Sequence, residues 1–347
     1  MAGTSELASG LTESPAPGAP KHPITSEALP DELVAEIFTR YLPPYPSFPP
    51  WVGPGSPTHL LGVCRVWRAI ALNTPSLWRA IHVESIDRKD IETAHLWLKR
   101  SGSSLLALQI VTVYHNPLAS TATTARSPDT AAELSHPLVQ ELLANRWRWE
   151  YVDWDLSEPM IASFAAAPVP NLVHLSLGTV RRPPLAPRTQ VLRLTECERL
   201  RAVNLWNVAV DNTSFAVGQL TTLTIINVDS CYQCMKVLEA ARNLVECRLY
   251  IRPRALTRNR SFDFDSLDGY LVEVPRLETL VFEDITTPSQ DWLARLVVPS
   301  LRRLAVSCEL LDTRDVNDSA IASLWSGCRG MIGIRSTTSR VIRSRVG

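Results

Sequence analysis

The sequence predicts an α/β protein in which a small N-terminal helical unit precedes an irregular array of strand-bearing repeats. Three observations predict this fold class. Apolar residues recur at helical spacing in two segments before residue 73, and a loose leucine template recurs between residues 105 and 306. The composition, 45% hydrophobic and 20% charged, is typical of a globular chain, and 347 residues suffice for one large domain or two ordinary ones.

The first helix is expected at "LPDELVAEIFTRYL". Pro30 suits the first turn of a helix, and the two acidic residues after it favour the positive end of the helix dipole. Leu33 and Ile37 follow one another at i+4 spacing, as do Val34 and Phe38, so the apolar stripe is wide.

A proline-rich insertion, residues 43–57, ends this helix and forms a stiff, irregular connection. Ser56 then resembles an N-cap with Pro57 at the first helical position, and Leu60, Cys64 and Trp67 share one face of a second amphipathic helix. This helix is expected to end at 73–75. The two helices form a unit of about 50 residues that is marginally stable by itself.

The template Leu-x-x-Leu-x-Leu, read loosely, recurs at start-to-start intervals of 20 to 44 residues. Most intervals lie in or near the period of about 20–29 residues that is typical of leucine-rich repeats, where each unit supplies one strand and a return. Because one repeat cannot bury its own apolar face, the units are expected to fold as a stack. The expected strands begin at residues 105, 149, 172, 200, 220, 244, 277 and 301.

These patterns divide the chain into four segments. Residues 1–25 carry four prolines among small polar residues and predict a disordered tail, and residues 26–82 form the helical unit. Residues 83–327 form the repeat array. Residues 328–347 hold five arginines and no acid, which predicts a disordered basic tail, unless the array ends abruptly there without a polar cap.

Charge and cysteine content limit the partners. Lys+Arg 35 against Asp+Glu 35 gives a net charge of zero, which argues against nucleic acid as a partner. The segment "NRWRWEYVDWDL" could stack on single-stranded nucleic acid, but Trp149 and Trp154 occupy template positions and acids neutralise the arginines. No apolar run reaches about 18 residues and the N-terminus lacks secretory features, so neither a membrane span nor secretion is expected. The seven cysteines indicate reduced thiols and a cytoplasmic or nuclear location, or both.

No motif predicts catalysis, a metal or a cofactor. The pair Cys231 and Cys234 lacks the second pair that a zinc ribbon needs and the strand context of a thioredoxin, so a buried thiol pair is favoured. The acidic segment 263–269 fails the spacing of a calcium loop. No phosphate-binding loop, dinucleotide fingerprint, nucleophile elbow or paired-histidine motif is present.

The segments "LPDELVAEIFTRYL" and "LLGVCRVWRAIALNTPSLWRAIHV" resemble the F-box of a large fungal group in which an N-terminal F-box precedes irregular leucine-rich repeats. The phrases "WLKRSG", "PNLVHLSL", "RNLVECRL" and "PSLRRLAV" extend the resemblance to about residue 307, although the spacer 43–57 is long for an F-box. The resemblance implies a helical F-box followed by a leucine-rich-repeat solenoid. It also implies a non-catalytic substrate receptor of a Skp–cullin–F-box ubiquitin ligase.

Binding residues follow from this resemblance. Those expected to contact a Skp-type adaptor, and through it a cullin, are Leu29, Pro30, Leu33, Ile37, Leu60, Leu61, Val63 and Trp67, although Phe38, Cys64 and Trp67 could instead form the core of the unit. Side chains between the template leucines are expected to face an unknown target protein, namely Ser176, Asn204, Trp206, Thr224 and Arg248, with Val281 and Ala305 as further candidates. The alternatives are a ligase-independent scaffold for protein–protein interaction and an enzyme whose site the sequence does not reveal.

Overall fold

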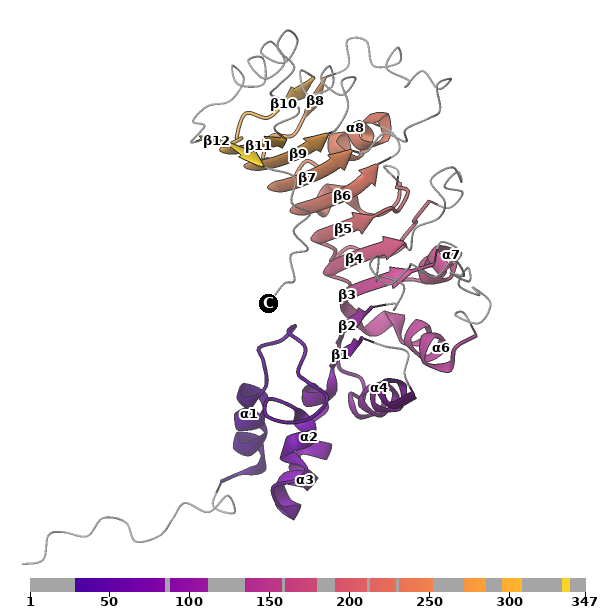
Figure 1. Ribbon diagram of the computed structural model, residues 1–347, viewed down its shortest axis with the longest axis vertical. Helices are drawn as coiled ribbons and strands as arrows, with labels where there is room; N and C mark the ends of the chain where they lie inside the picture. The colour runs from indigo at the N-terminus through magenta and orange to yellow at the C-terminus, as the bar shows by residue number, and fades with distance from the viewer. Residues whose placement is uncertain are drawn as a thin grey trace, which may run out of the picture.

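The computed structural model describes residues 29–84, 88–111, 135–157, 160–179, 191–210, 213–228, 231–251, 271–284, 295–307 and 333–337. Its main feature is a 10-stranded sheet whose strands follow one another in chain order from β1 to β12 (Figure 1). Because every strand pairs in parallel with its predecessor, each connection must cross back over the sheet before the next strand begins.

The strands are short and begin close to where the leucine template places them. Those of the main sheet are β1 (Ala80–Val83), β2 (Leu106–Ile110), β3 (Trp149–Leu156), β4 (His174–Thr179), β5 (Ala202–Trp206), β6 (Thr222–Val228), β7 (Glu246–Ile251), β9 (Thr279–Asp284), β11 (Arg303–Ser307) and β12 (Gly333–Thr337). A separate two-stranded parallel sheet pairs β8 (Val272–Glu273) with β10 (Leu296–Val297). The eight strands expected from the template are all present.

The crossovers differ from one another. Those that carry helices lie on one side of the main sheet (Figure 1). In the other crossovers, the residues that the structure describes form a 3-10 turn, the two strands of the small sheet and an isolated bridge. The helical elements are α4 (Arg88–Arg100), α6 (Pro137–Ala144), η4 (Arg146–Arg148), α7 (Met160–Ala165), η5 (Val217–Gln219) and α8 (Cys231–Ala240).

Three short helices precede the sheet. They are α1 (Asp31–Tyr41), α2 (Pro57–Leu60) and α3 (Arg65–Leu72), followed by the 3-10 turn η2 (Pro75–Trp78). In α1, Asp31 and Glu32 occupy the first turn and Arg40 the last, as the helix dipole favours. The helix ends at Leu42, whose backbone is extended, because the proline that follows disfavours helical geometry at the preceding residue.

The single helix predicted after Ser56 is two helices. Ser56 does cap α2, and its side chain accepts a hydrogen bond from the Thr58 N–H, but this helix ends after one turn. Cys64 is extended (φ −156°, ψ 174°) and caps α3, with its Sγ accepting a hydrogen bond from the Trp67 N–H at 3.4 Å. Apolar spacing continues across the break, so periodicity alone does not reveal it.

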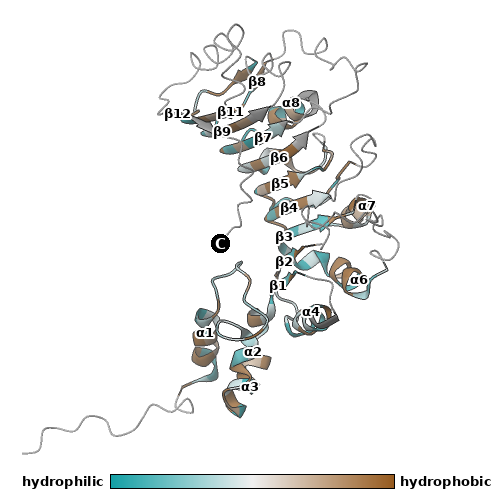
Figure 2. Cartoon of the chain, viewed as in Figure 1, coloured by the Kyte–Doolittle hydropathy of each residue, from teal (hydrophilic) through white to brown (hydrophobic). Residues whose placement is uncertain are grey.

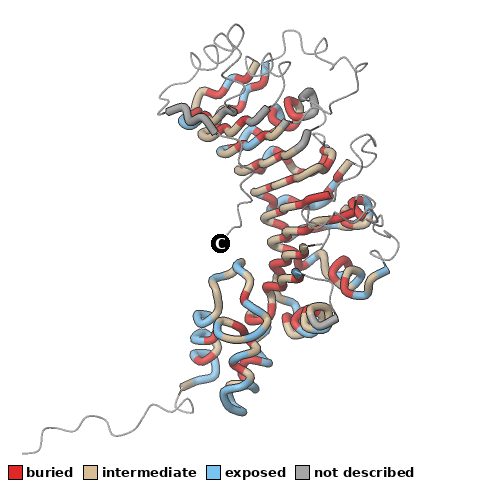
Figure 3. The backbone as a smooth tube through the Cα atoms, viewed as in Figure 1, coloured by how far each residue is buried: buried red, intermediate tan, exposed pale blue. Residues whose placement is uncertain are grey.

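The core follows the strand register. Buried residues from successive strands lie side by side, and polar or half-exposed residues alternate with them along each strand (Figure 3). Each fully buried leucine contributes about 1.5–3 kcal/mol relative to an exposed one. One such row runs across eight strands: Leu108, Val152, Leu175, Val203, Leu223, Cys247, Leu280 and Leu304.

The expected fold class, a helical F-box followed by a leucine-rich-repeat solenoid, is wrong. The described residues have an α/β arrangement built on one parallel sheet, with neither a separate N-terminal helical bundle nor regular strand-plus-return units. One hydrophobic cluster runs from Val34 in α1 to Leu304 in β11, so the front helices share the core of the sheet. The chain segments that connect consecutive strands differ widely in length, so each one packs against the sheet with a different set of residues. The strand-plus-connection units are therefore not regular repeats.

The three expected segment boundaries lie after residues 25, 82 and 327, and they relate differently to the residues that the structure describes. The boundary expected after residue 82 falls inside β1, and the expected tail at 1–25 lies outside the described residues. Within 328–347, for which a disordered basic tail is predicted, Gly333–Thr337 instead forms β12 and pairs with β11 in parallel. The physical reason is that the outer edge of β11 offers unpaired backbone groups to a neighbouring strand.

Candidate protein-binding surfaces

Exposed apolar side chains concentrate at the front of the molecule. Of the twelve large apolar side chains that are exposed in the described part of the chain, seven lie between residues 33 and 72. Figure 2 shows apolar residues along α1 and α3, where Figure 3 shows exposed chain. We define the front surface as the six of these residues on α1, on α3 and in the turn before α3: Leu33, Ile37, Tyr41, Val63, Val66 and Leu72.

The apolar residues of helix α1 lie on two sides of the helix, one buried in the core and one exposed. Val34 and Phe38 are buried, whereas Leu33 and Ile37 are 53% and 50% exposed. The Phe38 ring packs against the indole of Trp67, with ring centroids 4.9 Å apart. This packing fixes α1 against α3 from beneath and leaves the outer stripe of α1 uncovered.

The eight residues expected to contact an adaptor do not all lie on this surface. Leu33, Ile37 and Val63 are exposed and apolar, and Pro30 is exposed beside them. Leu60 is buried. Those that are partly buried against the core are Leu29, Leu61 and Trp67. Phe38, one of the residues that could instead form the core of the helical unit, is buried. Cys64, another of them, is exposed at the N-cap position of α3.

A second surface is the side of the main sheet that faces away from the helices, which we call the open face. The strand register places Ser176, Asn204, Thr224 and Arg248 side by side on four adjacent strands. Trp206 lies two residues further along its strand, level with Gly178. Ser176, Asn204, Thr224 and Arg248 therefore form one row across the sheet, which Val281 and Ala305 extend, and Trp206 lies outside that row.

Contacts within this row are polar and local. Asn204 Nδ2 donates to Ser176 Oγ at 3.3 Å. Arg248 forms an ion pair with Glu246 on its own strand, with Nη2 and Oε1 separated by 2.7 Å. Asn204 Oδ1 is buried and has no hydrogen-bond partner among the described residues. A buried carbonyl oxygen without a donor is costly, so this position favours a ligand that supplies one.

Sequence reasoning missed the contribution of the proline-rich insertion to the open face. Tyr45 lies 5.4 Å from the ring of Tyr151 in β3, and its Oη donates to Glu150 Oε2 at 2.9 Å. Phe48 lies 5.7 Å from the imidazole of His82 in β1. The aromatic residues between the prolines of "YPSFPPW" were the available signal, since a solvated linker has no need of them.

Burial sets the protonation of this region. It raises the pKa of the Tyr45 phenol, and the hydrogen bond to the Glu150 carboxylate raises that pKa further, so the phenol stays protonated and donates. Burial lowers the pKa of His82 and of His174 below the usual value of 6.5. Nearby carboxylates oppose this only in part, chiefly Glu84 at His82 and Asp153 at His174. Both imidazoles are therefore uncharged at neutral pH.

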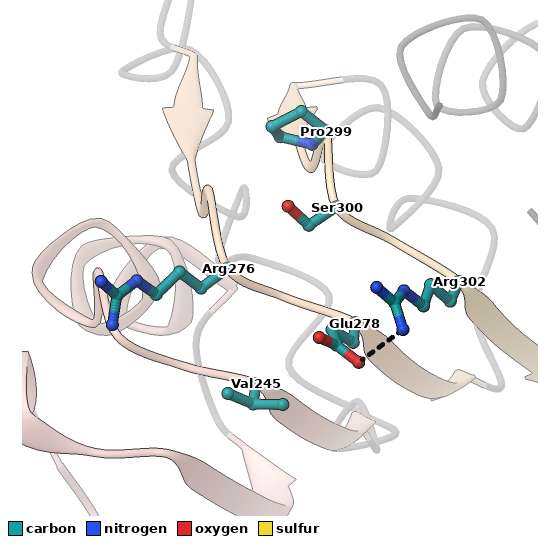
Figure 4. Close-up of a pocket in the computed structure, with 6 residues that line it drawn as sticks. All are labelled: Val245, Arg276, Glu278, Pro299, Ser300 and Arg302. Carbon is teal, nitrogen blue, oxygen red and sulfur yellow. Dashed lines mark ion pairs between the residues drawn. The ribbon is translucent and has the colours of Figure 1, made fainter. Parts of the chain in front are cut away.

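A shallow hollow lies where strands β7, β9 and β11 begin (Figure 4). Its charged residues are Arg276, Glu278 and Arg302, of which Arg302 Nη1 lies 3.7 Å from Glu278 Oε2. Ser300 Oγ donates to the Pro275 carbonyl at 2.6 Å. In the same way, Asn243 Nδ2 donates to the Gly218 carbonyl at 2.7 Å, earlier in the chain. These hydrogen bonds join neighbouring connections between strands, so we interpret the hollow as a structural feature of the fold and not as a binding site.

Metal binding has no site in the described part of the chain, and of the tryptophans in the segment considered for nucleic-acid stacking, Trp147 is 50% exposed. No group of three His, Cys, Asp or Glu residues there could hold a metal ion. Cys234 is buried, and the acidic segment 263–269 lies outside the described residues. Trp149 and Trp154 are buried in the core and cannot stack on bases. No helix among the described residues has the length and apolar character needed to cross a membrane.

Comparison with known proteins adds no relative: no family model matches the chain, and no curated protein matches it. The resemblance seen in the sequence stays a prediction.

Proposed function

We propose that the chain is the non-catalytic substrate-recognition subunit of a Skp–cullin ubiquitin ligase. In this proposal the front surface docks on a Skp-type adaptor, which binds the cullin, and the open face binds the target protein. The observation that supports it most is the half-exposed apolar stripe of Leu33 and Ile37 on α1. The sequence resemblance supports the identity of the partner.

The front surface has the properties of a docking face. Contiguous exposed apolar residues on a soluble protein are typical of interaction sites, and an amphipathic helix commonly places such residues in an apolar groove of its partner. Full burial of a leucine or isoleucine contributes about 1.5–3 kcal/mol, so completing the burial of two half-exposed side chains contributes about that amount in total. Phe38 and Trp67 beneath the surface hold the stripe in place before binding, which lowers the entropic cost of association.

The open face suits a polar partner. Its row of serine, asparagine, threonine and arginine side chains offers hydrogen-bond groups on neighbouring strands. Such a subunit holds the adaptor at one end and the target along the sheet, and it promotes ubiquitin transfer by positioning the target. It raises the effective concentration of a target lysine near the conjugating enzyme, and the proposal assigns no bond-making step to this chain.

Buried free thiols support a reducing location in the cytoplasm, the nucleus or both. Cys197 and Cys247 are buried free thiols, and burial raises the pKa of the Cys247 thiol. Such thiols persist in compartments that keep cysteine reduced.

The test is binding of the purified full-length chain to a purified Skp-type adaptor. Truncating interface anchors often costs at least about 2 kcal/mol, so the double variant Leu33→Ala/Ile37→Ala should weaken binding about thirtyfold. The control is Leu96→Ala, because Leu96 is exposed on α4, outside the front surface. Far-UV circular dichroism checks that each variant keeps its fold. Adaptor binding that is undetectable in the wild type, or equally tight in the double variant, refutes the proposal.

A ligase-independent scaffold for protein–protein interaction is the second candidate. The shared core of the front helices and the sheet favours it, because a docking unit that is a domain of its own has its own hydrophobic core. Addition of a purified cullin distinguishes the two. An adaptor-bound chain that recruits cullin supports the ligase, and an adaptor-bound chain that excludes cullin supports the scaffold.

A further inference from the structure

One end of the open face differs from the rest of the row, because aromatic rings from distant parts of the chain surround a carboxylate there. The rings come from the proline-rich insertion and from strands β1, β3 and β4. We define the aromatic corner as these rings and the carboxylate: Tyr45, Phe48, His82, Tyr151, His174 and Asp153.

Asp153 has spare capacity to bind a cation. Gln109 Nε2 donates to its Oδ2 at 2.9 Å. An ionised carboxylate accepts about four hydrogen bonds. Within the described ranges no lysine or arginine forms an ion pair with Asp153, although the side chain is half-buried. A half-buried carboxylate is more stable when a cation lies beside it.

The rings around Asp153 suit the same ligand. Tyr151 and His174 are nearly parallel, with centroids 6.5 Å apart and planes inclined by 27°. Aromatic faces attract cations, and cages of such faces recognise ammonium groups. The molecule already uses one of these rings in this way, because the Arg79 guanidinium lies 3.6 Å from the centroid of Tyr45.

The nearby charges are mostly negative. Glu84 Oε1 lies 3.7 Å from His82 Nε2, Asp90 also acts on His82, and Glu150 accepts the Tyr45 hydroxyl. The Arg79 guanidinium on the Tyr45 ring offsets one of these carboxylates, which leaves an excess of acid in the corner. It disfavours an anionic ligand and favours a cationic one.

Asn204 supplies a second point of attachment. Its partly exposed side chain lies on β5, two strands from Asp153 on β3, in the same row. Two strand spacings are about 10 Å, which is the length of about three extended residues. A backbone N–H three residues from a basic side chain would therefore reach Asn204.

We propose that the aromatic corner binds a basic side chain of the target polypeptide, lysine or arginine, in an extended segment that runs across the strands. This inference rests on the proposed role of the open face in target binding and adds the chemical class of the target residue. The ammonium or guanidinium group lies against Asp153 and the tyrosine and histidine rings, and the segment continues toward Asn204.

The experiment follows the side chains of the corner by NMR in the full-length protein. Imidazole carbons are labelled with ¹³C, and the signals of His82 and His174 are assigned with single His→Gln variants. The probes are the N-acetyl methylamides of lysine and arginine, and that of norleucine is the uncharged control of matching shape. We expect saturable shifts at His82 and His174 with a basic probe and none with norleucine.

Variants test which groups bind the probe. Asp153→Asn keeps an oxygen that accepts from Gln109 but removes the charge, and should weaken binding of the basic probe at least about fivefold. Tyr45→Leu removes a ring without touching Asp153, and should also weaken it. The matched control is Glu246→Gln, because Glu246 is a carboxylate on the open face that already pairs with Arg248, and binding should be unchanged.

The outcomes separate this inference from the proposed function. Equal shifts with norleucine, no shift with either basic probe, or wild-type affinity in Asp153→Asn overturns the basic-residue site. Should Asp153→Asn lose its fold, wild-type affinity in Tyr45→Leu overturns it instead. Adaptor binding is measured in the same preparations. A chain that binds adaptor but no basic probe refutes only the corner, and a chain that binds the probe but no adaptor refutes only the ligase role.

Discussion

Trp78 connects the front helices to the sheet, so its replacement tests whether both belong to one folding unit. Its indole is buried, and its Nε1–H donates to the Ala71 carbonyl of α3 at 2.9 Å. On the other side its ring lies 5.6 Å from that of Trp97, and the Arg100 guanidinium lies 4.5 Å from its centroid. Trp78→Ala therefore removes a buried ring, a hydrogen bond and a cation–π contact at one position.

The expected loss of stability is large. Truncation of a buried tryptophan or phenylalanine to alanine costs about 3–5 kcal/mol, against a total free energy of unfolding of about 5–15 kcal/mol for typical domains. We expect about 4 kcal/mol for Trp78→Ala. Trp78→Phe keeps most of the ring and removes one hydrogen bond to the Ala71 carbonyl, which still accepts from the Thr74 N–H at 3.4 Å, so it should cost only about 0.5–1.5 kcal/mol. Leu96→Ala, at an exposed position of α4, should change stability by less than about 0.5 kcal/mol.

The assay is equilibrium urea unfolding, followed by far-UV circular dichroism and by tryptophan fluorescence. If the front helices and the sheet unfold together, both probes give one transition, and Trp78→Ala moves all of it to lower urea. Two transitions, of which Trp78→Ala moves only one, would show that the front helices unfold separately. A loss below about 1 kcal/mol would show that Trp78 does not hold the two parts together.

Two further predictions follow. In the folded protein at about pH 8, iodoacetamide should modify the exposed Cys64 and spare Cys247, because Cys247 is buried and burial raises the pKa of its thiol. Peptide mass spectrometry measures this, and labelled Cys247 in the folded protein would contradict it. Burial also lowers the pKa of His174, so the folded state binds fewer protons than the unfolded state; the stability linked to this group is complete above about pH 6.5 and is lost as the pH falls below that value. His174→Gln should therefore lose less stability than the wild type between about pH 7.5 and 5.5 in urea unfolding, and an equal loss would show that His174 does not titrate as described.

Local patterns in the sequence determined much of the secondary structure. The leucine template located eight strands, and i+4 spacing in α1 showed that this helix has a wide apolar stripe. The same template placed Ser176, Asn204, Thr224 and Arg248 between buried positions, and the parallel register then aligned them in one row. These features depend on residues within one helical turn or one strand, and the spacing of such residues can be recognised directly in the sequence.

Tertiary contacts decided the rest. Which half of the α1 stripe is buried depends on Trp67, and the break at Cys64 depends on a cap that apolar spacing does not reveal. The aromatic corner depends on Tyr45 reaching Glu150, 105 positions away along the chain. The shared core, which overturned the expected fold class, likewise depends on packing between distant segments. A sequence pattern records what a residue does for its neighbours along the chain, whereas contacts between segments far apart in the chain are fixed only when the whole sheet assembles.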